Sequence, residues 1–143
     1  VVAKWSIPRH EEAHLYCLVC ILFFLPFFYL FVWLVAETLF LYQNSLRSSI
    51  PTQLGQLTTL KELDLGANRL TGGIPTEVGA LTGLISLSLY GNDLTGSIPS
   101  QLSRLTNLQV LYLDSNGLGP TLPASICSNL NLDEFWSDCD EIG

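Results

Sequence analysis

The chain has few basic side chains and only two histidines. Six lysines and arginines stand against 13 aspartates and glutamates among 143 residues, which gives a formal net charge of −7 at pH 7. Binding of nucleic acid needs a basic face, so this balance argues against a nucleic-acid partner. Both histidines, His10 and His14, lie ahead of a long apolar run, on the far side from the rest of the chain. No serine or cysteine nucleophile with a neighbouring base can therefore be assembled, and we expect no enzyme and no cofactor.

Other common signals are also missing. There is no Asn-x-Ser/Thr triplet, so no glycosylation site indicates secretion. There are four cysteines, and two of them, Cys17 and Cys20, form a C-x-x-C spacing inside the apolar run. In that setting we interpret them as small hydrophobic residues and not as a metal or redox pair.

One short motif suggests zinc chemistry. His10-Glu11-Glu12-Ala13-His14 matches H-E-x-x-H, in which two histidines bind zinc and the glutamate activates water. Pro8 lies two residues ahead of the first histidine, and no motif marks a third ligand. We expect no metal site, and a zinc metallopeptidase stays an alternative hypothesis.

The apolar run extends from Leu15 to Ala36 without a single charged residue. As a helix it would be about 33 Å long, against about 30 Å of membrane hydrocarbon. Lys4 and Arg9 precede it and an acidic excess follows, which favours a cytosolic amino terminus with the remainder outside. We predict a short polar tail over residues 1–14, a transmembrane helix over residues 15–36, and membrane lipid as one partner.

Three other interpretations of this segment stay open. A cleaved signal peptide has a shorter apolar core and small residues before the cut, which residues 33–36 match poorly. A buried helix could cover the first unit of the repeat described below. Unrelated coding could also have been joined to a repeat array, because the chain begins with Val1 and the repeat starts abruptly at Glu37.

After this run the sequence repeats at a constant interval. The interval equals the distance in sequence from Asn44 to Asn68. Asparagines and prolines recur at this spacing, with leucines in the same register: Asn44, Asn68, Asn92 and Asn116; Pro51, Pro75, Pro99 and Pro123. Each unit reads Leu-x-x-Leu-x-Leu-x-x-Asn-x-Leu-x-Gly-x-Ile-Pro-x-x-Leu-x-x-Leu, as in Leu84 to Leu105. From Glu37 to Cys139 the pattern resembles the plant-type leucine-rich repeat family. The resemblance implies a solenoid of four to five coils, with short parallel strands on the concave face and a 3-10 or irregular convex side.

The physical chemistry of the repeat agrees with this fold. A Leu-x-Leu strand turns alternate side chains inward, so Leu63 and Leu65 point to the core while Glu62 and Asp64 face out. An asparagine side chain has both a donor and acceptors, so the four repeated asparagines form a ladder that can satisfy the buried turn of every coil. No unit can bury its leucines alone, and each coil covers the next.

Function is then expected on the outward positions of the concave strands. Large aromatic side chains stand there beside acidic ones, as in many binding surfaces. Alternatively, the rings pack on one another as neighbours across the strands. The candidate ligand-binding residues are Phe40, Tyr42, Glu62, Asp64, Ser86, Ser88, Tyr90, Val110, Tyr112 and Asp114.

Both ends of the array depart from the pattern. Ser48 replaces the glycine of the later units, and Leu132 and Phe135 return to register as a fifth, partial strand. We divide the array into repeats over residues 37–131 and a cap over residues 132–143. The segment from Cys127 to Cys139 is similar to the carboxy-terminal cap of algal and diatom leucine-rich repeat proteins. In that family more cysteines usually follow, so we expect the cap to be truncated. A Cys127–Cys139 disulfide could close it in an oxidising compartment.

The leading functional hypothesis is a membrane-anchored, receptor-like recognition protein that binds a protein or peptide on its concave face. Its repeats would be extracellular, and resemblance to plant-type receptors suggests signalling or defence. The alternative is a secreted, soluble binding or inhibitor module of the same family.

Overall fold

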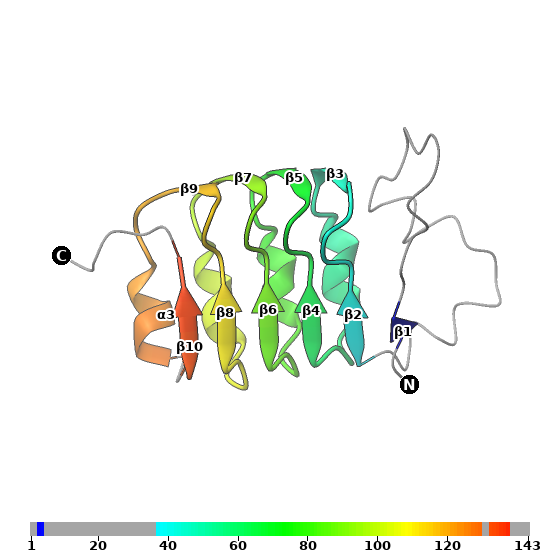
Figure 1. Cartoon of the computed structure of the whole chain (residues 1–143). Helices are drawn as coiled ribbons and strands as arrows, with labels where there is room; N and C mark the ends of the chain where they lie inside the picture. The colour runs from blue at the N-terminus through cyan, green and yellow to red at the C-terminus, as the bar shows by residue number, and fades with distance from the viewer. Residues whose placement is uncertain (1–2, 5–36, 130–131, 138–143) are drawn as a thin grey trace.

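The computed structural model describes residues 3–4, 37–129 and 132–137 of the chain, without the side chains of 3–4 and 127–129. The repeated units form coils that stack side by side, and each contributes one strand to a continuous parallel sheet (Figure 1). The strand order is β1-β2-β4-β6-β8-β10. Their bounds are β1 Ala3–Lys4, β2 Thr38–Phe40, β4 Glu62–Asp64, β6 Ser86–Ser88, β8 Val110–Tyr112 and β10 Glu134–Trp136. The predicted solenoid with parallel strands is confirmed.

The register of this sheet follows the sequence period. Leu63 pairs with Leu39 on one side and Leu87 on the other, and Leu87 pairs in turn with Leu111. Phe135 continues the row beside Leu111, as predicted for the fifth, partial strand. The leucines of successive coils therefore form one column, and those at positions 63, 87 and 111 are at most 1% exposed. Since each leucine removes its apolar surface from water only against its neighbours, the coils stabilise one another.

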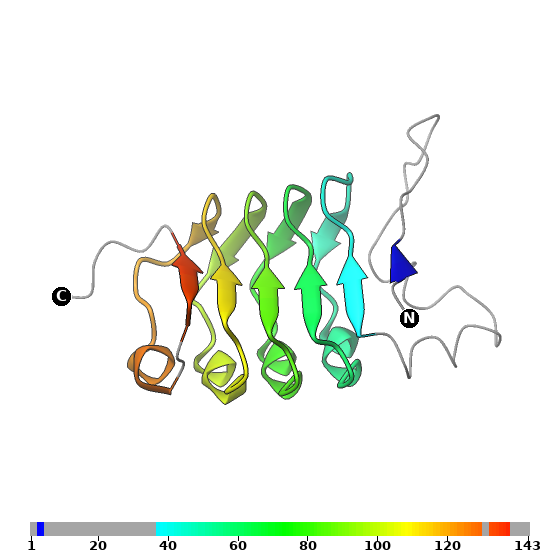
Figure 2. The same ribbon diagram turned by 60° about the horizontal axis from the view of Figure 1, so that its bottom comes forward.

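The convex side consists of short 3-10 helices, as predicted. They are η1 (Thr52–Gln56), η2 (Thr76–Ala80) and η3 (Ser100–Arg104), and α3 (Ala124–Asn129) takes the same place in the next coil. A proline with φ between −73° and −64° precedes each 3-10 helix, and its carbonyl accepts the first turn's hydrogen bond at 3.1 Å. Figure 2 shows these helices lying across the core from the strands.

A second parallel sheet was not predicted from the sequence. It contains β3 (Arg47–Ser49), β5 (Arg69–Gly72), β7 (Asp93–Gly96) and β9 (Gly117–Leu118), in that order. The sequence suggested only a return path with glycines for backbone freedom. Adjacent coils run close enough there for their backbones to pair, as the 2.9 Å bond from the Arg69 N–H to the Leu46 carbonyl shows.

The repeated asparagines connect neighbouring coils. The Asn68 side-chain amide donates to the carbonyls of Leu41, Leu65 and Gly66 at 2.9–3.0 Å, and its oxygen accepts the Leu46 N–H at 3.1 Å. Asn92 and Asn116 repeat this arrangement one and two coils further on. Among the described residues, Asn44 bonds within its own coil, to the carbonyls of Leu41 and Tyr42. These amides replace water for backbone groups that the turn buries.

Several predicted features fall outside the described residues. Among the residues that are described, no helix is long and apolar enough to cross a membrane, and the predicted transmembrane segment 15–36 is not among them. The zinc motif 10–14, Cys139 and the side chain of Cys127 are also outside. Within the predicted polar tail, Ala3–Lys4 pairs with β2 and extends the sheet by one strand.

Candidate functional site

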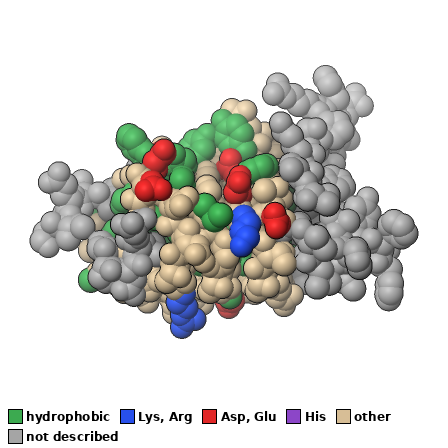
Figure 3. All heavy atoms as spheres, turned by 90° about the horizontal axis from the view of Figure 1, so that it is seen from below, with side chains coloured by type: hydrophobic (Ala, Val, Ile, Leu, Met, Phe, Trp, Pro, Cys, Tyr) green, Lys and Arg blue, Asp and Glu red, His purple; other side chains and the backbone are tan. Residues whose placement is uncertain are grey.

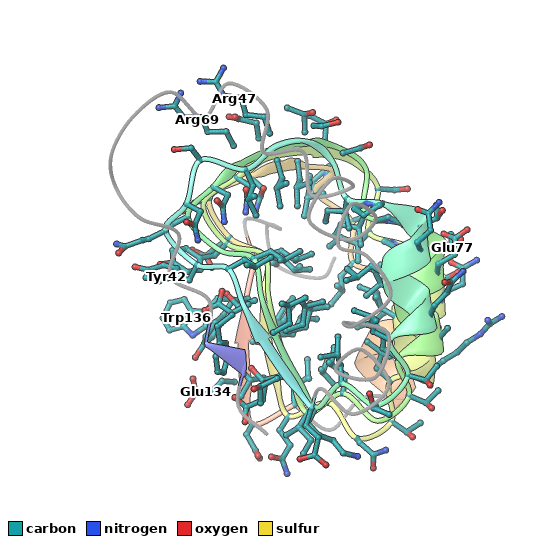
Figure 4. All side chains as sticks on the ribbon, turned by 90° about the vertical axis from the view of Figure 1, so that its right-hand side faces the viewer. Tyr42, Arg47, Arg69, Glu77, Glu134 and Trp136 are labelled. Atoms are coloured by element: carbon teal, nitrogen blue, oxygen red, sulfur yellow. The ribbon has the colours of Figure 1, made fainter. Side chains whose placement is uncertain are left out.

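The outward side chains of the first sheet form three rows, because residues one period apart occupy equivalent places in each coil. One row runs along the ends of the strands, a second along their first residues, and the third just beyond their ends. Figure 4, which looks along the stack, shows Tyr42, Glu134 and Trp136 projecting from the strand side of the core, opposite Glu77 on η2. The rows are Phe40, Asp64, Ser88, Tyr112 and Trp136; Glu62, Ser86, Val110 and Glu134; and Tyr42, Gly66, Tyr90 and Asp114.

A hollow of about 230 Å³ lies over the centre of this face. It exists because β6 carries two serines where the strands on either side carry larger residues. Small side chains in the middle of a sheet leave space that aromatic rings from other coils can surround but not fill. The lining residues are Phe40, Tyr42, Leu63, Asp64, Ser86, Ser88, Tyr90 and Tyr112.

Ser88 forms the floor of the hollow. The sequence predicted an outward-facing contact residue, but its surroundings leave only 6% of it exposed. Its Oγ is buried and has no hydrogen-bond partner among the described residues. A buried hydroxyl without a partner costs about 1–3 kcal/mol, and such groups are rare in native structures. This floor therefore offers an unused donor and acceptor to anything that enters the hollow.

Tyr42 and Tyr90 form one wall, although they belong to coils that are not adjacent. Their ring centroids are 5.9 Å apart with an angle of 32° between the planes. The intervening coil has Gly66 at the equivalent place, and a Cβ there would lie 2.6 Å from the Tyr90 ring. A hydrogen bond with Tyr42 is the main cause that raises the pKa of Tyr90 to about 12, with burial and the charges of Asp64 and Asp114 contributing. The rings thus do pack on one another, as the alternative interpretation held, but across two coils.

The acidic residues around the hollow are held in place by hydrogen bonds. One oxygen of Asp64, Oδ1, accepts the backbone N–H of Gly66 at 2.9 Å. The Tyr112 hydroxyl donates to the carboxylate of Glu134, and this bond raises the pKa of Tyr112. Figure 3 shows hydrophobic and acidic side chains gathered along the strand side, at the upper margin of that view. The site therefore combines aromatic rings with negative charge.

The other predicted site residues lie on the same face with different exposure. Glu62 is exposed, and Ser86, Val110 and Asp114 are partly buried. Sequence reasoning missed Glu134 and Trp136, which stand beside Val110 and Tyr112 in the register of β10. Trp136 is 63% exposed. Both residues could have been found by extending the columns of equivalent positions into the fifth strand.

Comparisons with known proteins agree with this architecture. Two family models match the chain, one described as "Leucine rich repeat" over residues 58–118 and one as "Leucine Rich Repeat" over residues 107–130. The search of curated protein sequences gave no match.

Three solved structures illustrate the similarity. The PEPR1–AtPEP1 structure is 36% identical with a TM-score of 0.67, and the similarity covers 69% of this chain and 14% of that one. The BIR3–SERK2 complex from Arabidopsis thaliana is 34% identical with a TM-score of 0.66, covering 71% and 55%. The plant peptide hormone receptor RGFR1 in complex with RGF2 is 39% identical with a TM-score of 0.66, covering 68% and 16%. The chain thus matches only part of each of these proteins.

Proposed function

Because the chain belongs to the leucine-rich repeat family, we propose that it is a receptor-like recognition protein that binds a peptide or protein on its first sheet. The observation that carries the proposal is the hollow of about 230 Å³ with aromatic walls and a buried Ser88 hydroxyl that has no partner among the described residues. Among the similar structures, RGFR1 is described as a plant peptide hormone receptor in complex with RGF2, and BIR3–SERK2 is also described as a complex. These similar proteins support a peptide or protein ligand for this chain.

The chemistry of the hollow favours binding over catalysis. Tyr90 and Tyr112 both have a raised pKa, so their hydroxyls stay protonated at neutral pH and are poor bases and nucleophiles. Protonated tyrosines instead offer flat apolar rings and neutral hydroxyls, which are typical of recognition surfaces. We therefore propose a role without enzymatic activity.

We further propose that residues 15–36 anchor the protein in a membrane and that the repeats are extracellular. The length and lack of charge of this segment support the anchor, and the similarity to a plant membrane receptor kinase ectodomain supports the extracellular placement. A secreted, soluble module is the alternative. Extraction of the native protein distinguishes the two, because an anchored protein needs detergent and stays with the membrane in high salt.

The double substitution Tyr90→Ala with Tyr112→Ala tests the binding face. It removes two walls of the hollow, and loss of central aromatic anchors weakens binding by at least tenfold in typical interfaces, about 1.4 kcal/mol. The probe is a peptide selected on the wild-type chain from a random linear peptide library, and its Kd is measured by isothermal titration calorimetry.

The matched control is Glu77→Ala with Arg104→Ala, which changes two exposed residues on η2 and η3, across the core from the strands. The control should bind the peptide within about twofold of wild type. Unchanged affinity in the tyrosine variant, with circular dichroism showing an intact fold, would contradict binding at this face.

A further inference from the structure

We infer that the hollow receives an arginine side chain of the ligand. Its guanidinium lies between the wall formed by Tyr42 and Tyr90 and the ring of Tyr112, next to Asp64 and Ser88. This inference rests on the proposed function and specifies the chemistry that the site selects. Three independent features of the described residues carry it: the charge of the face, the unused hydrogen-bonding groups of the hollow and the shape of its walls.

The charge of the strand face is negative. Asp64 lines the hollow. The acidic residues of the face come from several coils: Glu62, Asp64, Asp114 and Glu134. The basic side chains that the structure describes lie elsewhere: Arg47 and Arg69 on the second sheet, Arg104 on η3, and Lys61 against the turn at Gly83. A ligand carboxylate would meet repulsion here, whereas a cation finds a complementary charge.

The hydrogen-bonding groups that remain unused are suited to a donor. Asp64 uses Oδ1 for the Gly66 N–H, and its Oδ2 has no partner among the described residues. Ser88 stands beside Asp64 in the register of the sheet, and within the part of the chain that the structure describes its Oγ has no partner either. Neighbouring strands are about 4.8 Å apart, so one planar group with several N–H donors can reach both oxygens. A guanidinium has five such donors in a fixed plane.

The walls favour arginine over lysine. The planes of the Tyr42 and Tyr90 rings form an angle of 32° with each other. Tyr112 borders the hollow on the other side of Ser88. A planar guanidinium stacks on such faces and is weakly hydrated, whereas an ammonium is a compact and strongly hydrated point charge. The flat cation therefore loses less hydration on entry and makes more contacts.

The test compares capped tripeptides that differ only at the central side chain. Acetyl-Gly-Arg-Gly-amide and its citrulline, lysine and glutamate counterparts are titrated into the ¹⁵N-labelled full chain in detergent micelles and followed by NMR. The arginine peptide should shift the amides of Gly66 and Ser88. Citrulline has the same shape without the charge and should bind at least about tenfold more weakly, as should glutamate; lysine should bind several-fold more weakly.

Single substitutions distinguish binding of arginine at this site from a general effect of the protein's negative charge. Asp64→Asn keeps the oxygen that accepts the Gly66 N–H but removes the charge, and should weaken the arginine peptide about tenfold. Glu77→Gln removes one charge from the opposite side of the molecule and should change affinity less than about twofold. A third variant, Ser88→Ala, removes the floor hydroxyl and should weaken binding about three- to tenfold while leaving the fold intact.

Equal binding of arginine and citrulline would overturn the inference, as would tighter binding of lysine or glutamate. So would an Asp64→Asn variant that behaves like Glu77→Gln. If these peptides fail while a library-selected peptide still loses affinity in the Tyr90 and Tyr112 double variant, arginine recognition is wrong and the proposed binding face stands. If the selected peptide is also indifferent to the double variant, the proposed function fails.

Discussion

At the scale of single residues, the wall of the hollow depends on one missing Cβ. Gly66 allows Tyr90 to lean over the second coil and reach Tyr42, since any side chain at position 66 would meet the Tyr90 ring at 2.6 Å. The ring contact that results joins two coils that share no strand pairing. A row of tyrosines at this position would stack in order and leave less space between them.

The Tyr42–Tyr90 contact predicts a measurable pH dependence. Folding raises the pKa of Tyr90 from 10.0 to about 12, so its contribution to stability is fully present below pH 10 and is lost as the pH rises through 12. Tyr42→Phe removes the main cause, and the pKa of Tyr90 should fall toward 10. NMR titration of tyrosines labelled with ¹³C at Cζ measures this shift.

Tyr112→Phe is the control for that titration. It removes the bond to Glu134 and should leave the pKa of Tyr90 where it is in the wild-type chain. A Tyr90 that titrates unchanged in Tyr42→Phe would show that the two hydroxyls do not interact in solution.

At the scale of elements, strands β3, β5 and β7 of the second sheet share an unusual backbone conformation. Gly72 and Gly96, at the ends of β5 and β7, have φ of +75° and +84°. The equivalent residue of the first coil is Ser48 in β3, with φ of +81°. A residue with a Cβ is strained at positive φ by about 1–2 kcal/mol, which glycine avoids. The first coil therefore stores strain where the later coils have none.

Exchanging these residues should change stability in opposite directions. Ser48→Gly should stabilise the fold by about 1 kcal/mol because it releases strain, and Gly96→Ala should destabilise it by about the same amount. A Cβ at position 96 would meet no atom of the described residues within 4 Å, so the change comes from the backbone conformation. Urea unfolding gives both free energies of unfolding, and shifts of the same sign would contradict the argument.

At the scale of the whole molecule, the coils are joined by a hydrogen-bonded ladder as well as by the leucine core. The Asn92 amide donates to Leu65 of the preceding coil at 3.1 Å and to Leu89 of its own coil at 2.9 Å, and its oxygen accepts the Leu70 N–H at 3.0 Å. The residue is 7% exposed, so water cannot replace these bonds. Cooperative unfolding of the stack should depend on them.

Removing one asparagine of the ladder should therefore destabilise the fold more in the middle of the stack than in its first coil. Asn92→Ala leaves buried backbone groups of two coils without hydrogen-bond partners and should lower the free energy of unfolding by about 2–4 kcal/mol. Asn44→Ala removes two bonds within the first coil, as far as the described residues show, and should lower it by about 1 kcal/mol. Urea unfolding measures both, and equal losses would show that the ladder does not link coils.

The period, the core and the parallel strands follow from the sequence alone. Each repeated unit forms one coil, so residues one period apart must become neighbours once the leucines are buried together. This is why Leu63, Leu87 and Leu111 could be placed in one column, and why the outward rows could be listed. The same rule predicts Glu134 and Trp136 on the face when it is carried one coil further.

The space between those rows is instead a property of the folded chain. The hollow depends on two serines next to larger side chains, and the Tyr42–Tyr90 contact depends on a ring that crosses a glycine in another coil. The second sheet depends on how closely the return paths of adjacent coils approach. A repeat specifies which residues are equivalent, whereas the space among them follows from side-chain volumes and conformations in three dimensions.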